Sequence, residues 1–243
     1  MTPIRIYGAD LRQIPAAACF DLLDESETRR AAAIKIPSAK MEFVKTRALL
    51  RLVLAANSPG MRPQDFVFRT EANGKPYLAD DTGLHFNVSH SRDMALIAVA
   101  PFPIGIDIEF QNETVDYLDV AESVFSASER AIVRNNGGNA RRDAFFSLWA
   151  RKEAYLKATG IGFSAKLDQI STIQPNGVVE DLSQVSQPTI WHVMDLPVSN
   201  GYNAALVTPT NEVDVSIQTV SGDELSLPTN LDRSQPTDWQ RAS

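Results

Sequence analysis

Cysteine is nearly absent from the sequence, because Cys19 is the single one in 243 residues. A lone cysteine excludes an intramolecular disulfide and any metal cluster held by several cysteines, and it is typical of the reducing cytosol. Histidine is scarce as well, and the scatter of His85, His90 and His192 disfavours a zinc site built from all three. We therefore expect a cytoplasmic protein.

An excess of basic charge is also missing. Lys and Arg number 23 against 30 Asp and Glu, which leaves a net charge of −7. Because nucleic-acid affinity comes mainly from neutralised phosphates, this balance argues against DNA or RNA as a partner. A local basic pocket for a small phosphorylated ligand remains compatible with it.

Long apolar segments are missing too. The uncharged stretch 94–106 contains two prolines and is shorter than a membrane-spanning helix, which needs roughly 20 residues. The first residues show no apolar signal-peptide core. Since 44% of the residues are hydrophobic and 22% are charged, the composition fits a folded globular chain without a membrane partner.

Hydrophobic periodicity and end signals predict helices followed by strands in each half of the chain. Capping boxes begin helices at Asp24 and Ser126, Gly160 ends a long helix, and Asn73-Gly74 marks a hairpin. The expected helices are 24–33, 39–57, 126–135 and 140–159. The expected strands are 1–7 (an edge strand), 66–69, 76–78, 84–89, 94–100, 104–109, 177–179, 189–193, 204–208 and 213–220, with a turn at 90–93.

This order of elements predicts an α+β fold with two similar lobes. We place the N-terminal lobe at 1–103 and the C-terminal lobe at 104–222, and we expect residues 223–243 to form a frayed tail. The sequence similarity between the halves is too faint to prove a duplication. The cleft between the lobes is the expected ligand site.

Two carboxylates stand close together in Gly105-Ile106-Asp107-Ile108-Glu109. Side chains two residues apart share one face of a strand, so Asp107 and Glu109 point together while the isoleucines point into a core. Such a pair repels unless a cation offsets it, and hard carboxylate oxygens suit Mg²⁺. A solvated strand face is the simpler alternative for a bare Asp-x-Glu.

One stripe of the predicted helix 140–159 mixes Trp149 and Leu156 with the charged residues Lys152, Glu153 and Lys157. An ordinary amphipathic helix would place only apolar residues there. A carboxylate between two lysines is what a metal-bridged phosphate site needs. Alternatively, Trp149 and Leu156 belong to the core and the charged side chains reach water along its border.

A strand that ends in Ser89-His90-Ser91 offers a hydroxyl and an imidazole to a phosphate at a sheet edge. A Ser–His hydrolase pair is a weak rival, because neighbouring residues on a strand point apart. A structural histidine at the turn is the other alternative.

Two further segments carry basic residues. Lys75, between Gly74 and Pro76 in the expected hairpin, lies either near a phosphate beside a flat ring or simply exposed on a turn. Arg47 and Arg51 are four residues apart on one helix, where they either grip a phosphate jointly or face water.

Together and in this order, these segments resemble the 4′-phosphopantetheinyl transferases of the surfactin-synthetase-activating type. The resemblance covers about residues 29–163, and the spacing of Gly-Ile-Asp-Ile-Glu and Trp-x-x-Lys-Glu-Ala-Tyr-Leu-Lys is its most specific part. The segments that carry it are Arg47–Arg51, Asn73–Pro76, Phe86–Ser91, Gly105–Glu109, Trp149–Lys157 and Gly160–Phe163.

The resemblance implies an enzyme that moves the phosphopantetheine arm of coenzyme A to a serine of an apo acyl or peptidyl carrier protein and releases 3′,5′-ADP. It would act as a cytoplasmic monomer in fatty acid, polyketide or nonribosomal peptide synthesis. The family fold is a pseudo-dimer of two α+β lobes in one chain, with coenzyme A in the cleft.

The resemblance also implies roles for single residues. Mg²⁺ would be held by Asp107, Glu109 and Glu153, and Asp107 would thereby lie at the pyrophosphate of coenzyme A. Glu153 would take the proton of the carrier serine, unless a metal-bound water does so, and Lys157 would contact phosphate oxygens. The remaining expected coenzyme A contacts are Arg47, Ser89 and His90 around the 3′-phosphate and ribose, and Gly74, Lys75 and Pro76 along the adenine.

The basic residue of the first helix stays open among Arg29, Arg30 and Lys35. Two other functions use the same features. One is a Mg²⁺-dependent nucleotide pyrophosphohydrolase with the same three carboxylates. The other is a coenzyme A-binding or carrier-binding module without catalysis.

Overall fold

The computed structural model describes residues 1–80, 82–112, 114, 116–162, 165–173, 175–182 and 189–222. The first part of the chain forms β1 (Thr2–Asp10), α1 (Ala16–Phe20), α2 (Glu25–Ala33), α3 (Pro37–Asn57), β2 (Phe68–Thr70), β3 (Pro76–Leu78), β4 (His85–Ser91) and β5 (Met94–Ala100). The rest forms β6 (Gly105–Phe110), α4 (Tyr117–Val124), α5 (Ala127–Asn135), α6 (Gly138–Thr159), β7 (Ile170–Ser171), β8 (Glu180–Asp181), β9 (His192–Leu196), β10 (Tyr202–Thr208) and β11 (Val213–Thr219). Short 3₁₀ turns lie at Pro63–Asp65, Leu167–Gln169 and Pro175–Gly177.

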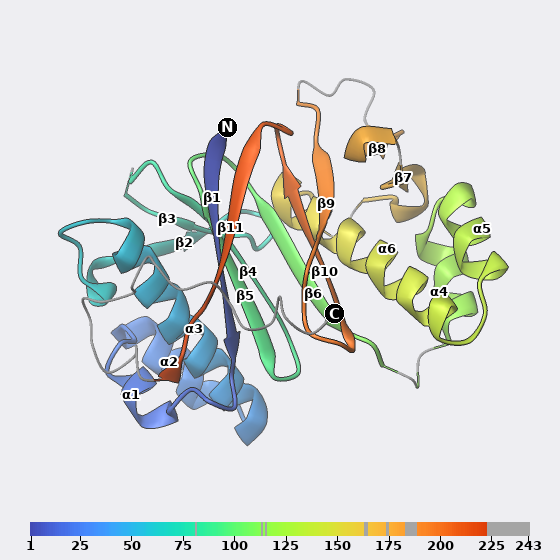
Figure 1. Cartoon of the computed structure of the whole chain (residues 1–243). Coiled ribbons are helices and arrows are strands. Elements are labelled where there is room, and N and C mark those ends of the chain that lie inside the picture. The colour runs from blue at the N-terminus through green and yellow to red at the C-terminus, as the bar shows by residue number, and fades with distance from the viewer. Residues whose placement is uncertain are drawn as a thin grey trace.

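Two sheets lie between two groups of helices (Figure 1). The first sheet has the order β11-β1-β5-β4, and α1, α2 and α3 lie on its outer side. The second sheet has the order β6-β10-β9, and α6 packs on its outer side beside α4 and α5. The predicted mixture of helices and strands is therefore confirmed.

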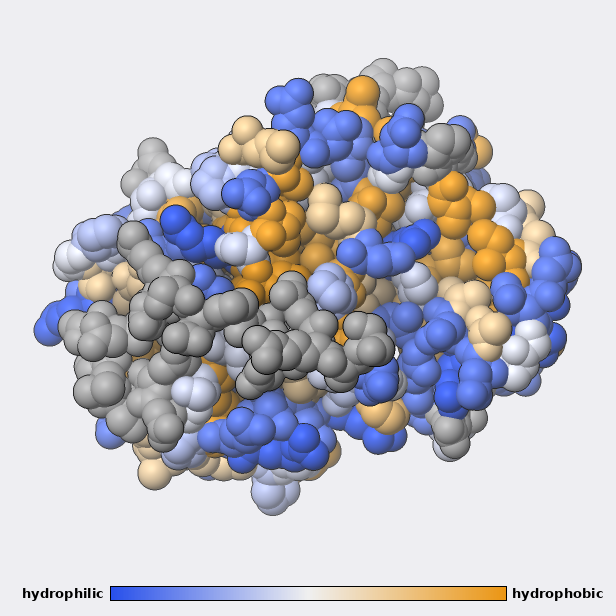
Figure 2. Space-filling view, in the orientation of Figure 1, coloured by the Kyte–Doolittle hydropathy of each residue, from blue (hydrophilic) through white to orange (hydrophobic). Residues whose placement is uncertain are grey.

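Alternation along the strands builds the core. In β1, Tyr7 and Ala9 pack toward the helices of the first sheet, whereas Ile4 and Ile6 face the second sheet. Ile106 and Ile108 of β6 belong to the same cluster as Ile4 and Ile6, which lies between the two sheets. This is the inward direction expected from their places in the strand. In the face shown in Figure 2, hydrophobic side chains gather over the region where β9 and β11 lie, and the cluster there includes Met194, Val213, Val215 and Ile217.

The predicted helix caps and glycine turns lie where the sequence placed them. Asp24 and Ser126 each accept a hydrogen bond from the backbone N–H of the glutamate three residues later, and both capping boxes are complete. Gly160 ends α6 in the left-handed conformation, with φ of 69°. Gly74, with φ of 92°, lies in the turn that joins β2 and β3.

Several expectations need correction. The first strand is interior, because β11 pairs with β1 on one side and β5 on the other. The fourth strand continues through Ser91, so the turn narrows to Arg92-Asp93. Helices α1 and α4 were not predicted. A 3₁₀ turn and β8 replace the strand expected at 177–179, and β9 begins where the strand expected at 189–193 was to end.

The lobe boundary stays a prediction. Strand β11 falls within the expected C-terminal lobe, yet it pairs with β1 in the first sheet. The expected tail 223–243 and Phe163 lie outside the described residues. Within the described ranges, no helix is both long and apolar enough to cross a membrane.

Candidate functional site

The Asp107 carboxylate lies at the centre of the candidate site. Its residue is 3% exposed, on the face of β6 that turns toward α6. Asp107 Oδ1 accepts hydrogen bonds from Ser89 Oγ at 2.7 Å and from Lys157 Nζ at 2.6 Å. Burial raises the pKa of Asp107, and the nearby Lys157 ammonium opposes that shift.

Glu109, two residues further along β6, lies near the rim of the same face. Trp149 Nε1 donates to Glu109 Oε1 at 3.2 Å, and Ser91 Oγ donates to Glu109 Oε2 at 3.2 Å. Burial, helped by the negative charge of Asp107, raises the pKa of Glu109 to about 7. The two carboxylates therefore disfavour each other's ionised form, as expected for neighbours on one face of a strand.

Glu153 and Lys157 lie one turn apart on α6. Burial and the charge of Asp107 raise the pKa of Glu153, while Lys157 opposes the shift. Both side chains line a cavity of about 280 Å³, whose opposite border is the hairpin turn with Gly74, Lys75 and Pro76. The structure thus brings together residues of α6 and of a hairpin turn that lies about 80 positions earlier in the sequence.

The donor set fits a hard divalent cation. Asp107 Oδ2 is buried and has no hydrogen-bond partner among the described residues, which leaves one carboxylate oxygen available for a ligand. Carboxylate oxygens are the ligands that Mg²⁺ prefers. In the part of the chain that the structure describes, however, no three acidic, His or Cys side chains are already gathered as metal ligands, and Lys157 holds the other Asp107 oxygen.

A second cavity, of about 310 Å³, contains the cationic side chains. It is lined by Arg30, Arg47 and His90, together with Thr46 and Pro76. The hydroxyl of Thr46 is buried without a hydrogen-bond partner among the described residues. Since Pro76 borders both this cavity and the one beside Glu153, the two cavities are neighbours.

Two predicted residues in this second cavity already have acidic neighbours. Arg47 Nε lies 3.3 Å from a Glu27 carboxylate oxygen, and burial lowers the pKa of Arg47. His90 Nδ1 lies 2.6 Å from Glu42 Oε1. Any anion that enters the cavity would therefore compete with Glu27 for Arg47 and with Glu42 for His90.

The hairpin turn is attached to the end of α6. Lys75 Nζ donates to the carbonyl of Ala158 at 2.8 Å, and Asn73 Nδ2 donates to the carbonyl of Gly160 at 3.0 Å. The last carbonyls of a helix lack partners within it, so these contacts satisfy them and fix the hairpin against α6. Lys75 is thus neither a freely exposed turn lysine nor free for a phosphate in this conformation.

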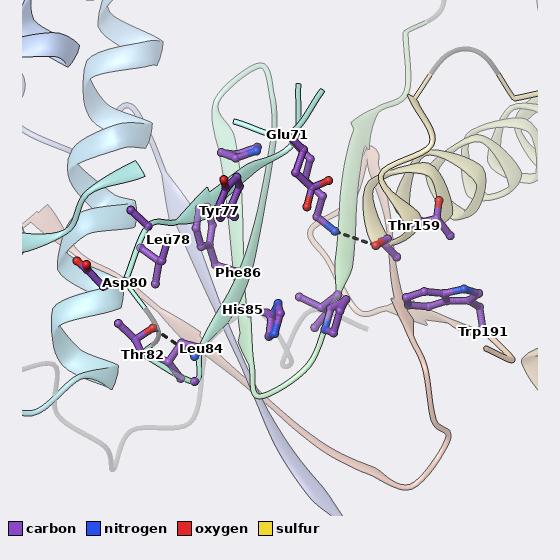
Figure 3. A pocket seen from close by; sticks show the side chains of 17 residues that line it. Glu71, Tyr77, Leu78, Asp80, Thr82, Leu84, His85, Phe86, Thr159 and Trp191 are labelled. Atoms are coloured by element: carbon purple, nitrogen blue, oxygen red, sulfur yellow. Dashed lines mark hydrogen bonds between the residues drawn. The ribbon is translucent and has the colours of Figure 1, made fainter. Parts of the chain in front are cut away.

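A larger cavity, of about 510 Å³, lies on the far side of Lys75 from Glu153. Figure 3 shows Leu78 and Leu84 on one side of it and Trp191 on the other, with His85 between them. Its volume exceeds that of the other two cavities, but the carboxylates of β6 do not line it. Glu71, Lys75 and Asp80 also line this cavity, but the Lys75 ammonium is bonded to the carbonyl of Ala158. We place the chemistry at the carboxylates of β6, because Asp107 there contacts Lys157, which lines a cavity together with Glu153.

Ser89 and Arg51 lie in other surroundings than the sequence led us to expect. The side chain of Ser89 turns to Asp107 and is not brought into the cavity with Arg47 and His90. Arg51 is fully buried, where it pairs with Asp24 and Glu27, so it does not grip a ligand jointly with Arg47.

Lys152 is also interior, so it neither reaches water nor borders a phosphate site. The residue is 2% exposed, and its Nζ lies 2.9 Å from Glu129 Oε2. It also donates to the carbonyls of Leu167 and Ile170. Of the two lysines that flank Glu153, only Lys157 therefore faces the carboxylates of β6.

Three further residues contribute to the site: Arg30, which the sequence left open beside Arg29 and Lys35, Ser91, which lay in a quoted motif without a role of its own, and Thr46, which the sequence did not single out. Arg30 lines the second cavity and lies over the Phe43 ring at 5.2 Å, whereas Arg29 pairs with Glu25 and does not line that cavity. The packing of α2 on α3 decides that Arg30, and not Arg29, faces the cavity. No pattern in the sequence predicts that packing. For Ser91, its alternation with Ser89 along β4 was the available signal.

These features define a class: two sheets between helices, with a buried carboxylate, a facing lysine and cationic cavities at their junction. Residues 103–207 match the family model of the 4'-phosphopantetheinyl transferase superfamily. The matched segment contains β6 and α6, and hence Asp107, Glu109, Glu153 and Lys157.

Curated relatives extend the match. The chain is 30% identical to the putative 4'-phosphopantetheinyl transferase slr0495 of Synechocystis sp., over 79% of this chain and 82% of that protein. It is 32% identical to the 4'-phosphopantetheinyl transferase Sfp of Bacillus subtilis, over 66% of this chain and 71% of that protein. It is 38% identical to the 4'-phosphopantetheinyl transferase HetI of Nostoc sp., over 61% of this chain and 63% of HetI.

The chain belongs to the 4'-phosphopantetheinyl transferase superfamily, which confirms the resemblance seen in the sequence. The matched part spans 63% of the length of HetI.

Proposed function

We propose that the chain transfers the 4′-phosphopantetheine arm of coenzyme A to a serine of an apo acyl or peptidyl carrier protein, requires Mg²⁺ and releases 3′,5′-ADP. The observation that carries this proposal is the contact between Lys157 and Asp107 at 2.6 Å, beside a cavity that Glu153 also lines. It combines a buried anion, a cation and a candidate base at one place. Membership of the family supports the same reaction.

Coenzyme A would occupy the two neighbouring cavities. Its 3′-phosphate would lie with Arg30, Arg47 and His90, because two guanidinium groups and an imidazole line one cavity. Its adenine would lie along Gly74, Lys75 and Pro76, and its pyrophosphate would reach Lys157 in the other cavity. Pro76 borders both cavities, so one extended ligand can contact both sets of residues.

Asp107, Glu109 and Glu153 would hold Mg²⁺. When bound there, the ion would supply Lewis-acid stabilisation of the charge that builds up on the pyrophosphate. Lys157 would add a compact positive charge to the same oxygens, which favours the more highly charged transition state over the bound substrate.

Glu153 would act as the general base. The carrier serine oxygen attacks the β-phosphorus, and its proton passes to the Glu153 carboxylate. The bond between the β-phosphorus and the bridging oxygen breaks, so the electron pair leaves with 3′,5′-ADP. The position of Glu153 supports this role, because its side chain lines the cavity that would hold the pyrophosphate.

We also propose that the fold is a pseudo-dimer of two similar lobes with the ligand cleft between them. Each long helix, α3 with 21 residues and α6 with 22, covers the outer side of one sheet. The candidate residues come from α3 and β4 on one side of the junction and from β6 and α6 on the other.

The test is to incubate the purified chain with coenzyme A, Mg²⁺ and a set of apo acyl and peptidyl carrier proteins, and to measure carrier mass and nucleotide products. We expect a covalent mass gain on a carrier serine together with 3′,5′-ADP. Asp107→Ala should abolish the gain. Asp143→Ala is the matched control, because Asp143 is an exposed carboxylate on the same helix as Glu153.

Two results would replace the proposal. Splitting of coenzyme A without any carrier product would identify a pyrophosphohydrolase. Binding of coenzyme A or of a carrier without any product, at a saturating concentration of Mg²⁺, would identify a non-catalytic module.

A further inference from the structure

Strand β4 at the edge of the first sheet and strand β6 at the edge of the second are joined by side chains. Asn87 Oδ1 accepts from the backbone N–H of Ile106 at 2.9 Å. Ser89 Oγ accepts from that of Ile108 at 3.2 Å, and Ser91 Oγ from that of Phe110 at 3.0 Å. The three contacts share one spacing, 19 residues, so the two strands run parallel along this ladder of hydrogen bonds.

The ladder takes the place of strand pairing. In the described part of the chain, strand β6 pairs with β10 on one side and with no strand on the other, so its remaining N–H groups need partners from elsewhere. Ile106 is fully buried and Ile108 is 1% exposed, which leaves little water for their backbone groups. A buried backbone N–H without a partner is costly, and short polar side chains at every second position of β4 supply the acceptors.

The two serines make a second contact that Asn87 does not make. Ser89 Oγ donates to Asp107 at 2.7 Å, and Ser91 Oγ donates to Glu109 at 3.2 Å. Each serine therefore accepts from the N–H of one β6 residue and donates to the carboxylate of the residue before it. The residue before Ile106 is Gly105, which offers no carboxylate to Asn87.

Ser89 is the more fully engaged of the two. Its oxygen also accepts from Lys157 Nζ at 2.9 Å, so its two acceptor positions and its single donor are all used. A group with that set of contacts has no freedom to rotate away from Asp107. Its place in the ladder thus determines where Asp107 Oδ1 lies.

We propose that Ser89 and Ser91 are positioning residues that hold the Asp107 and Glu109 carboxylates for their ligand. Asn87, which also lines the cavity beside Glu153, fixes the register of β6 against β4 and orients no carboxylate. The proposal rests on the function proposed above, in which these carboxylates bind Mg²⁺. Residues that orient metal-binding side chains affect metal affinity without touching the metal.

The test compares Ser89→Ala with Asn87→Ala, its matched control. Each variant removes one acceptor from the ladder, but only Ser89→Ala removes a donor to a carboxylate. Hydrogen exchange should rise at least tenfold at Ile108 in the first variant and at Ile106 in the second. Titration with Mg²⁺ alone should show an affinity about tenfold lower for Ser89→Ala, and within about threefold of wild type for Asn87→Ala.

Ser89→Thr keeps the hydroxyl and should restore Mg²⁺ affinity to within about threefold of wild type. If Ser89→Ala does not fold, Ser91→Ala tests the same point at the half-buried end of the ladder. Equal Mg²⁺ affinities for the serine and asparagine variants would overturn the proposal, because the serines would then fix only the register.

Failure of the proposed function gives a different pattern. A wild-type chain that binds Mg²⁺ but modifies no carrier would contradict the transferase assignment, while the comparison of the variants by exchange and Mg²⁺ affinity would still decide the role of the serines.

Discussion

Asp107 shows how burial and charge are balanced at the scale of one residue. A carboxylate moved out of water favours its neutral form, and the pKa of Asp107 is raised accordingly. The Lys157 ammonium and the Ser89 hydroxyl act against that shift by stabilising the ionised form. The unpartnered oxygen, Oδ2, is the part of the group that a cation would stabilise further.

Arg30 should act on the 3′-phosphate of coenzyme A, and Arg29 should not. Arg30 lines the cationic cavity, whereas Arg29 pairs with Glu25 on the surface. Losing a charge-assisted hydrogen bond costs about 1.5–3 kcal/mol, so Arg30→Ala should weaken coenzyme A binding about tenfold or more. Calorimetric titration should show a much smaller loss for dephospho-coenzyme A, and no change for either ligand with Arg29→Ala. Equal losses for both ligands would remove Arg30 from the phosphate site.

Glu109 should make the metal-free protein less stable as the pH rises. Its pKa is about 7 when folded against an ordinary value of 4.5, so the folded state binds more protons between these two values. Stability from this group is therefore fully present below about pH 4.5 and is lost as the pH rises through about 7. Solvent at the half-buried side chain limits the effect to about 2 kcal/mol.

Melting curves from pH 4.5 to 8 in a metal chelator measure this effect. Glu109→Gln should flatten that part of the profile, because the amide does not titrate. Parallel profiles for the variant and the wild type would contradict the raised pKa.

Single residues differ in how well the sequence predicted them. Asp107, Glu109, Glu153 and Lys157 were singled out because their spacing puts them on defined faces of a strand and a helix, and the family resemblance supplied their predicted roles. The burial of Lys152 could not be found in this way, because its partner Glu129 is 23 residues away on α5 and only tertiary packing joins them. The turn of Ser89 toward Asp107 likewise depends on contact between two sheets.

At the scale of elements, the site depends on how closely β6 approaches α6. A Cβ atom at Gly105 would lie 1.9 Å from the carbonyl oxygen of Ala154 and 2.5 Å from the backbone nitrogen of Ala158. Both are backbone atoms of α6, so they cannot move aside as a flexible side chain would. The absent side chain lets β6 carry Asp107 to within hydrogen-bond distance of Lys157.

Gly105→Ala should push these two elements apart. Overpacking against backbone atoms should cost about 3 kcal/mol, which lowers the melting temperature by roughly 5–10 °C in a chain of this size. Carrier modification should fall more than stability alone explains, since Asp107 and Lys157 separate. Gly137→Ala is the control, because a Cβ there meets nothing within 4 Å, and its melting temperature should change little. Similar melting temperatures for both variants would show that α6 can shift without cost.

Helix ends were predicted better than strand neighbours. A capping box or a left-handed glycine is a local signal, and Asp24, Ser126 and Gly160 all act as expected. The partner of a strand is not local. Strand β1 was expected at an edge because nothing in its own residues indicates that β11 pairs with it. Strand β11 lies more than 200 positions away in the sequence.

At the scale of the whole molecule, β11 brings the last described strand of the chain beside the first, β1. It runs parallel to β1 from Thr2↔Val213 to Gly8↔Thr219. Val213, Val215 and Ile217 also pack against the cluster between the two sheets. The strand therefore stabilises both the first sheet and the interface that faces Ile106 and Ile108 of β6.

A chain that ends at Asn211 should accordingly lose its cooperative fold. Removal of β11 exposes one edge of β1 and uncovers apolar side chains between the sheets, so we expect the melting temperature to fall by more than roughly 10 °C, or insoluble protein. A chain that ends at Gly222 keeps β11 and the hydrogen bond from Val220 to Gly8, and it should melt within about 2 °C of the full chain.

Ile217→Asp in the full chain separates the loss of packing from the loss of chain length. The variant places a charge against the apolar cluster between the sheets, so it should destabilise the protein in the same direction as truncation at Asn211. Carrier modification should decline together with stability in both cases, because the candidate residues lie on both sides of that interface. A stable, active chain ending at Asn211 would show that the two sheets hold the site without β11.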